Sequence, residues 1–150
     1  MADLKRPELD DIHHVKMLVS DLADSLRWWE RAFGAQRSEH LDHVTPDGEL
    51  FGYIMSVPGI TPPLELALAP GGSLAGAFGP VALAVESRDD LDRWAAWFDE
   101  VGIDHSTVLR GLGSWVLVVR DPDGTPVRLY CRETHEWDAE GAAFDSPWLL

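Results

Sequence analysis

The sequence predicts an α+β protein in which a strand, a helix and three further strands occur twice in succession. A faint internal repeat pairs Val15 with Val81 and Trp28 with Trp94, 66 positions apart in both cases. Each copy opens with a short β-rich run that is followed by an amphipathic helical pattern. Turn residues then divide the rest of each copy into strand-like runs.

Two amphipathic helices are expected, one in each half. Apolar residues recur at spacings of three and four: Leu22, Leu26, Trp29 and Phe33, then Leu91, Trp94, Ala95 and Phe98. A serine or aspartate precedes each helix as its expected N-cap: Ser20 or Asp21, and Ser87 or Asp89. Each helix is expected to end at a glycine, Gly34 or Gly102, because glycine readily adopts the left-handed conformation that closes helices.

The strands are expected where apolar and β-branched runs lie between turns. In the first half they are His14–Val19, Ser38–Val44, Leu50–Val57 and Pro63–Ala69; in the second, Pro80–Val85, Asp104–Leu109, Ser114–Arg120 and Pro126–Arg132. The strands of each half should form a largely antiparallel sheet with the helix on one face.

The expected organisation is one domain over residues 1–150, long enough to bury a sizeable core. Its parts are a first module at about 12–70, a linker at about 71–79, a second module at about 80–132 and a tail at 133–150. The linker is the stretch that opens with Pro70-Gly71-Gly72-Ser73.

Charge and composition exclude several partners. There are 26 acidic and 12 basic residues, a formal net charge of −14, which argues against nucleic acid and anionic membranes. The charge suits a cationic ligand, or it serves only solubility. The single cysteine, Cys131, and the lack of a long apolar run or a secretory N-terminus predict a cytoplasmic protein with no membrane partner.

Two motifs in order resemble one family. The opening His13–Leu22 with the Trp28-Trp29 pair, and the ending Asp121–Leu129, resemble the vicinal oxygen chelate superfamily, which contains glyoxalases, bleomycin resistance proteins and extradiol dioxygenases. The resemblance covers about residues 12–132. It implies two βαβββ modules that form a half-barrel mixed sheet, the glyoxalase/bleomycin resistance/dihydroxybiphenyl dioxygenase fold. It also implies a homodimer and a ligand on the concave face, often with a divalent metal.

The metal ligands of that family carry over only in part. The matching positions here are His14, Glu65, Pro80 and Arg128. Proline offers no donor atom, and arginine is a permanent cation. A catalytic site usually has three protein ligands, so no metal cofactor is expected. A divalent metal on His14 and Glu65 stays an alternative; it would need a further histidine such as His40 or His43, which reach inward only in another strand register.

The resemblance also places Arg128 across the pocket from Glu65. Either the two form an ion pair that fills the vacated space, or Arg128 binds an oxygen of a ligand while His14 moves a proton. In the second case His14, Glu65 and Arg128 are the candidate catalytic residues.

Strand alternation suggests further ligand-binding residues. Lys16 lies on the same face as His14, where it pairs with Glu65 or contacts ligand. Tyr130 lies beside Arg128. Trp115 is the candidate to stack on a planar ligand, unless it faces the other way and belongs to the core. Four alanines leave open volume on this face, Ala67, Ala69, Ala82 and Ala84.

Three functions follow as hypotheses. The first is a small-molecule-binding protein without a catalytic metal, which resembles the antibiotic-binding and resistance branch and takes a cationic or aromatic ligand. The second is a glyoxalase-like lyase, isomerase or epimerase using His14, Glu65 and Arg128, or a metal-dependent enzyme with a non-standard ligand set. The third is an interaction module whose pocket is filled by its own side chains. The sequence leaves open whether the protein is an enzyme.

Overall fold

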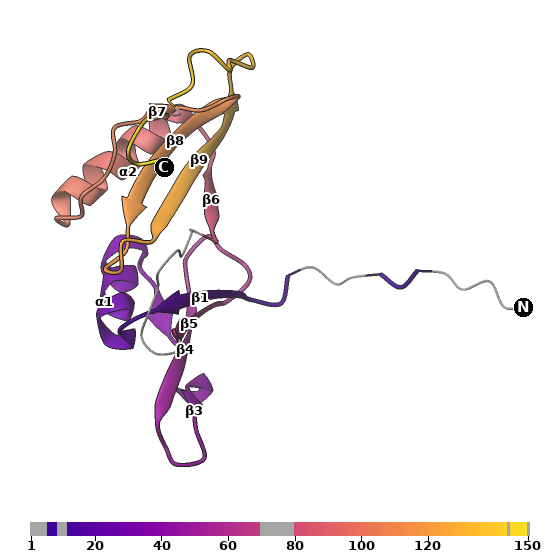
Figure 1. The fold of residues 1–150 in the computed structure, drawn as a ribbon, viewed down its shortest axis with the longest axis vertical. Helices are drawn as coiled ribbons and strands as arrows, with labels where there is room; N and C mark the ends of the chain where they lie inside the picture. Colours follow the sequence, from indigo (N-terminus) through magenta and orange to yellow (C-terminus); the bar gives the residue numbers. More distant parts are fainter. Residues whose placement is uncertain (1–5, 9–11, 70–79, 144, 150) are drawn as a thin grey trace, which may run out of the picture.

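The computed structural model describes residues 6–8, 12–69, 80–143 and 145–149. It has the predicted α+β architecture, with two mixed sheets and two α-helices (Figure 1). The predicted linker at 71–79 lies outside the described residues.

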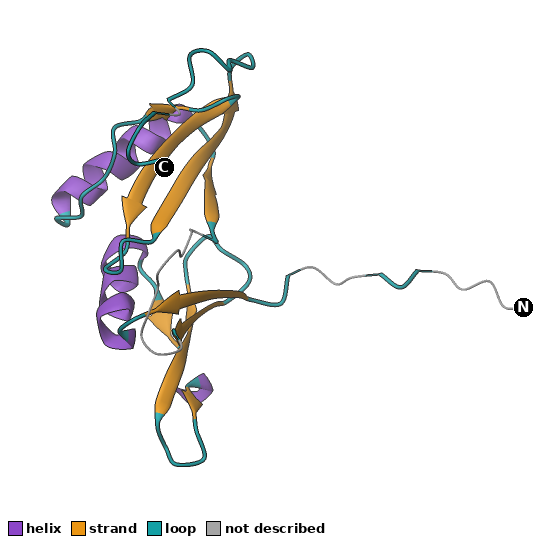
Figure 2. Cartoon of the chain, viewed as in Figure 1, coloured by secondary structure: helices purple, strands orange, loops and turns teal. Residues whose placement is uncertain are grey.

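The first module forms a mixed sheet with one helix against it (Figure 2). Its elements are β1 (Val15–Val19), α1 (Leu22–Phe33), β2 (Gln36–Arg37), the 3-10 helix η1 (Glu39–Leu41), β3 (His43–Val44), β4 (Leu50–Ser56) and β5 (Leu64–Leu68). The strand order is β1-β5-β4-β2, and β3 also pairs with β4. The β1–β5 pair is parallel and the others are antiparallel.

The second module repeats this plan, which confirms the repeat in the sequence. Its elements are β6 (Ala82–Val85), α2 (Arg88–Glu100), β7 (Leu109–Arg110), β8 (Ser114–Arg120) and β9 (Pro126–Thr134). The strand order is β6-β9-β8-β7, again with the first and last strands of the module parallel to each other. The strand that opens each module therefore lies beside the strand that ends it.

The helix caps follow the sequence. Asp21 caps α1 and accepts a hydrogen bond from the Asp24 N–H at 2.8 Å, and Gly34 ends the helix in the left-handed conformation with φ 70°. Ser87 caps α2 in a capping box with Asp90. A capping box satisfies two backbone N–H groups that would otherwise lack partners, so both helix starts are fixed locally.

The prediction of one continuous strand over Ser38–Val44 is wrong. Within this range only β3 is a strand, because the chain first forms the 3-10 turn of η1, in which Leu41 N–H donates to the Ser38 carbonyl at 2.9 Å. An ion pair between Arg37 and Asp42 closes the turn. Local hydrogen bonds of this kind compete with sheet pairing and break the strand.

The prediction of a strand over Asp104–Leu109 is also wrong. Only an isolated bridge at His105 and the short β7 pair with β8. The side-chain oxygen of Ser106 accepts the Val118 N–H at 2.9 Å and so takes the place of a backbone carbonyl in the ladder.

Aromatic packing joins the two modules. The Phe33 ring at the end of α1 lies 5.5 Å from Trp94 and 5.9 Å from Phe98, centroid to centroid. The Trp97 indole N–H donates to the Ala32 carbonyl at 3.0 Å. Together with a hydrogen bond from Ser20 N–H to Asp123, these contacts hold the modules end to end, as Figure 1 shows.

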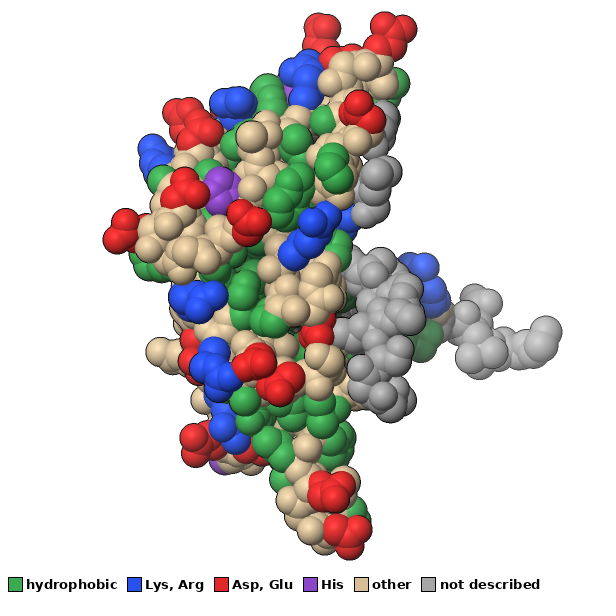
Figure 3. Space-filling model, turned by 60° about the vertical axis from the view of Figure 1, so that its left-hand side comes forward, with side chains coloured by type: hydrophobic (Ala, Val, Ile, Leu, Met, Phe, Trp, Pro, Cys, Tyr) green, Lys and Arg blue, Asp and Glu red, His purple; other side chains and the backbone are tan. Residues whose placement is uncertain are grey.

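Acidic side chains are spread over the molecular face drawn in Figure 3, with basic side chains between them. They do not gather into one patch on that face, so the view supports a general solubilising charge. Among the described residues, no helix has the length and apolarity that a membrane span requires.

The turn between β8 and β9 contains a buried carboxylate, which gives a testable pH dependence. Asp121 Oδ1 accepts the N–H groups of Asp123 and Thr125 at 3.0 and 2.9 Å, while Oδ2 has no hydrogen-bond partner among the described residues. Burial raises the pKa of Asp121 from 3.8 to about 6. The folded state therefore binds this proton more tightly than the unfolded state does.

Asp121→Asn is expected to become relatively more stable than the wild type as pH rises. Below pH 4 Asp121 is protonated in both states and burial costs little. Between pH 4 and 6 the wild type loses stability, up to about 3 kcal/mol, because the carboxylate must ionise while buried. Urea unfolding of both proteins at pH 4 and pH 7 measures this difference. A difference in unfolding free energy that is the same at both pH values would contradict it.

Candidate functional site

Sheet register places Glu65 on the face of the first sheet that is turned away from α1. The parallel pairing sets Lys16 directly beside Glu65, and the antiparallel pairing sets Ile54 on its other side. The neighbouring Leu64 and Leu66 are part of the core on the opposite face, because side chains alternate along a strand. The Glu65 side chain is only 4% exposed.

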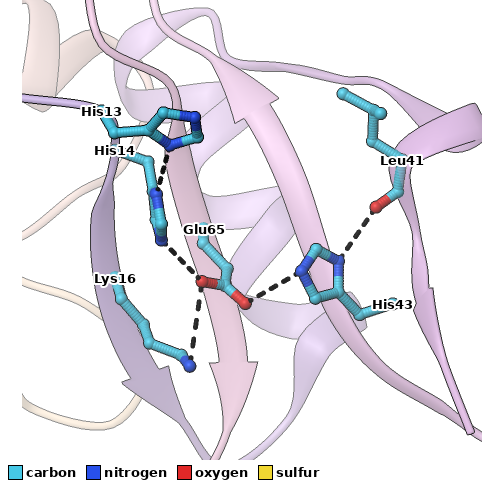
Figure 4. Close-up of polar contacts among 6 residues, drawn as sticks. All are labelled: His13, His14, Lys16, Leu41, His43 and Glu65. Atoms are coloured by element: carbon cyan, nitrogen blue, oxygen red, sulfur yellow. Dashed lines mark hydrogen bonds and ion pairs between the residues drawn. The ribbon is translucent and has the colours of Figure 1, made fainter.

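Three basic side chains surround the Glu65 carboxylate (Figure 4). His14 Nε2 lies 3.4 Å and Lys16 Nζ 3.9 Å from Oε2, and His43 Nε2 lies 3.4 Å from Oε1. These separations are ion-pair distances and lie beyond the usual range of a hydrogen bond. A buried carboxylate held only by longer contacts keeps unused acceptor capacity, which a ligand donor can take up.

His43 joins the site, although the predicted strand register turned it away from Glu65. It comes from β3 and lies over Gly52 of β4, where a Cβ atom would be 3.2 Å from the Cβ of His43. Its Nδ1 contacts the Leu41 carbonyl at 3.0 Å, which fixes the ring orientation. The prediction of an unbroken strand gave His43 the wrong orientation, because the 3-10 turn before β3 changes the register.

The arrangement around Glu65 does not fit a metal ion. Figure 4 shows His14 and His43 on opposite sides of the carboxylate, so their ring nitrogens do not converge on one point, and the Lys16 ammonium occupies the same region. No group of three or more His, Cys, Asp or Glu side chains in the described part of the chain is placed to hold an ion. Pro80 and Arg128, at the other two matched positions, offer no ligand atoms.

Arg128 does not meet Glu65 within the chain. It lies on β9 between Ala82 of β6 and Val118 of β8. In the part of the chain that the structure describes, the ion pairs of Glu65 all come from the first module. The expected pair across the pocket is therefore not formed in the single chain.

A second candidate region is a cavity of about 650 Å³ in the second module. Its described lining comes from the β7–β8 turn, from β8 and β9, and from the tail: Arg110, Gly111, Leu112, Gly113, Ser114, Val116, Tyr130, Thr134, His135, Trp137, Ala142, Ala143 and Leu149. This volume and this mixture of apolar walls with a few polar groups are typical of small-molecule sites.

The tail is tied to the β7–β8 turn by its backbone. His135 N–H donates to the Gly113 carbonyl at 3.0 Å, Asp138 N–H to Leu112 at 2.8 Å, and Ala143 N–H to Arg110 at 2.8 Å. Backbone hydrogen bonds at three points make the tail a fixed wall of the cavity.

One ion pair reinforces that wall. Arg110 Nε donates to Asp138 Oδ2 at 2.9 Å. The hydrogen bond from the Gly141 N–H and this contact with Arg110 hold the pKa of Asp138 below its usual range. Gly141 lies so close to Asp138 that a side chain at that position would clash with the carboxylate.

The two predicted aromatic residues have different places. Tyr130 lines the cavity and is 36% exposed. Trp115 packs against the hydrophobic core, with its ring 4.7 Å from that of His135. The described residues that line the cavity do not include Trp115. The register of the β8–β9 pair shifts between Ser114 and Val116, on either side of Trp115.

Comparison with known proteins defines the family. The model of the glyoxalase/bleomycin resistance protein/dioxygenase superfamily matches residues 11–129. The chain therefore belongs to this superfamily. A search of curated proteins found no match.

Solved structures share the fold. An antibiotic-binding protein from Streptomyces sp. CB03234 has a TM-score of 0.68 at 16% identity, covering 85% of this chain and 100% of the other. Lactoylglutathione lyase from Agrobacterium tumefaciens has a TM-score of 0.63 at 18% identity, with 85% and 96% covered. A mutant fosfomycin resistance protein from Listeria monocytogenes, solved with Mn(II), has a TM-score of 0.60 at 14% identity, with 83% and 93% covered.

Proposed function

We propose that this protein binds a small organic molecule without a catalytic metal, in the manner of the antibiotic-binding members of its superfamily. The observation that carries the proposal is the cavity of about 650 Å³ in the second module, which has apolar walls, few polar groups and an aromatic residue from β9. Pro80 and Arg128 at two of the four metal positions support the metal-free part.

The −14 net charge supports a neutral or cationic ligand. The one arginine among the described lining residues, Arg110, is already paired with Asp138. Because Asp138 already neutralises this arginine, the site favours a ligand that binds through apolar and aromatic surface over an anionic ligand.

A metal titration tests the metal-free part of the proposal. Protein purified without chelator or histidine tag is titrated with Mn²⁺, Fe²⁺, Ni²⁺ and Zn²⁺ in a calorimeter. We expect dissociation constants weaker than about 1 mM, a binding free energy weaker than about −4 kcal/mol. Tight stoichiometric binding that disappears in His14→Ala would overturn this part. A thermal-shift screen of antibiotics on the same protein tests ligand binding.

The contacts of Glu65 favour a second function, acid–base catalysis by a lyase, isomerase or epimerase. A buried carboxylate between two histidines is suited to hold or move a proton. Arg128 would take part only if another subunit brought it to this site. Exchange of the C–H protons of dihydroxyacetone into deuterium oxide, lost in Glu65→Gln, would support this function over simple binding.

The homodimer and the cytoplasmic location stay predictions. Exposed apolar side chains on the first module support a contact with a second copy: Leu18, Leu41, Val44 and Phe51. Sedimentation equilibrium measures the mass in solution.

A further inference from the structure

We infer that Trp137, on the C-terminal tail, is the residue on which a planar aromatic ligand stacks in the second-module cavity. This inference rests on the proposed small-molecule binding and adds the ligand class and the residue that selects it. The tail lies beyond the residues 11–129 that the family model matches, so the match to the family does not include Trp137.

The exposure of Trp137 is the first support. Its side chain is 74% exposed, more than any other large hydrophobic residue in the described part of the chain. The residue nevertheless lines the cavity. An indole that faces a cavity and is covered by so little of its own chain has apolar surface available for a ligand.

The second observation is that the β7–β8 turn lies against the Trp137 ring. The six-membered ring of Trp137 lies over Gly113, where a Cβ atom would be 3.6 Å from Cε3 and 3.9 Å from Cζ3. The six-membered ring of the indole is therefore in contact with the β7–β8 turn at Gly113. The hydrogen bonds of His135 and Asp138 to that turn hold the chain on both sides of Trp137.

The chemistry of the other walls selects a flat, largely apolar molecule. Tyr130 supplies a second partly exposed aromatic ring, and Leu112 and Leu149, both partly exposed, supply apolar surface. Offset stacking on an aromatic ring favours planar π-systems over saturated molecules of the same size. The hydroxyl group of Tyr130 offers a polar contact at the edge of such a molecule.

Dye binding by variants tests the inference. The probe is proflavine, a planar aromatic cation, titrated by fluorescence anisotropy, with tetraethylammonium as a cation that has no ring. We expect proflavine to bind and tetraethylammonium not to bind. Trp137→Ala should weaken proflavine binding at least tenfold, and Trp137→Phe should restore most of the loss, because it keeps a ring.

Trp97→Phe is the matched control, since it alters a partly exposed tryptophan outside this cavity. It should leave the affinity unchanged, and the melting temperatures should show that all variants fold. Equal proflavine affinity in wild type and Trp137→Ala would overturn the inference, as would the absence of proflavine binding. A change in sedimentation of Trp137→Ala without a change in dye affinity would assign the ring to a subunit contact instead.

The experiments distinguish a failure of the proposed small-molecule binding from a failure of the role of Trp137. If antibiotics in the thermal-shift screen bind equally to the wild type and Trp137→Ala, small-molecule binding stands and the role of Trp137 falls. If neither the antibiotics nor the dye bind the wild type, both fall.

Discussion

Trp29→Ala is expected to destabilise the protein by about 3–5 kcal/mol, as large-to-small changes at fully buried aromatic positions do. Trp29 lies on the inner face of α1 with 0% exposure, and its ring is 5.4 Å from that of Trp28 and 5.1 Å from that of Phe33. Its indole N–H has no hydrogen-bond partner among the described residues, so the loss comes from packing. Guanidinium unfolding monitored by circular dichroism measures it.

Trp137→Ala provides the matched control, because the same change at an exposed site should alter stability by no more than about 0.5 kcal/mol. A loss below about 1.5 kcal/mol for Trp29→Ala would show that α1 does not pack on the first sheet as described. Equal losses of unfolding free energy in Trp29→Ala and Trp137→Ala would contradict the buried position of Trp29 and the exposed position of Trp137.

Ala143→Trp is expected to abolish ligand binding, with affinity for a cavity ligand reduced at least 100-fold. Ala143 lines the cavity and its N–H is held by the Arg110 carbonyl, so an indole at this position projects into the space that the ligand needs. A 100-fold loss corresponds to about 2.7 kcal/mol. Fluorescence titration with proflavine, or with a ligand from the antibiotic screen, measures the change.

Ala96→Trp is the control, since it places the same side chain on the exposed side of α2. Its affinity should equal that of the wild type. If Ala143→Trp binds ligand as well as Ala96→Trp does and both are folded, the ligand lies elsewhere, and the face around Glu65 becomes the leading alternative.

Local signals in the sequence were sufficient to predict the order of elements in the two modules. The repeat that pairs Val15 with Val81 corresponds to the equivalent strands β1 and β6, of which β6 begins one residue after Val81, and each is parallel to the last strand of its own module. The predicted caps at Asp21 and Ser87 hold because their side chains bond to backbone groups only a few residues away. The short strands could not be predicted, because the Arg37–Asp42 pair and the Ser106 hydroxyl replace ladder contacts there.

The site was predictable only where strand alternation alone decides it. Lys16 lies beside Glu65 because adjacent parallel strands in register present the same face. The predicted register turned His43 away from Glu65, since its actual position depends on the turn before β3 and on the space above Gly52. Trp115 and Trp137 were indistinguishable by composition, and only tertiary packing places one against the core and the other on the cavity.

We propose that this superfamily member holds an organic ligand without a metal. The most direct test is calorimetry of the wild type with its best ligand from the antibiotic screen, before and after exhaustive treatment with EDTA. We predict one ligand per chain and the same dissociation constant in both titrations. Binding that EDTA abolishes and a single divalent metal restores would contradict the claim and would identify a metal-dependent site.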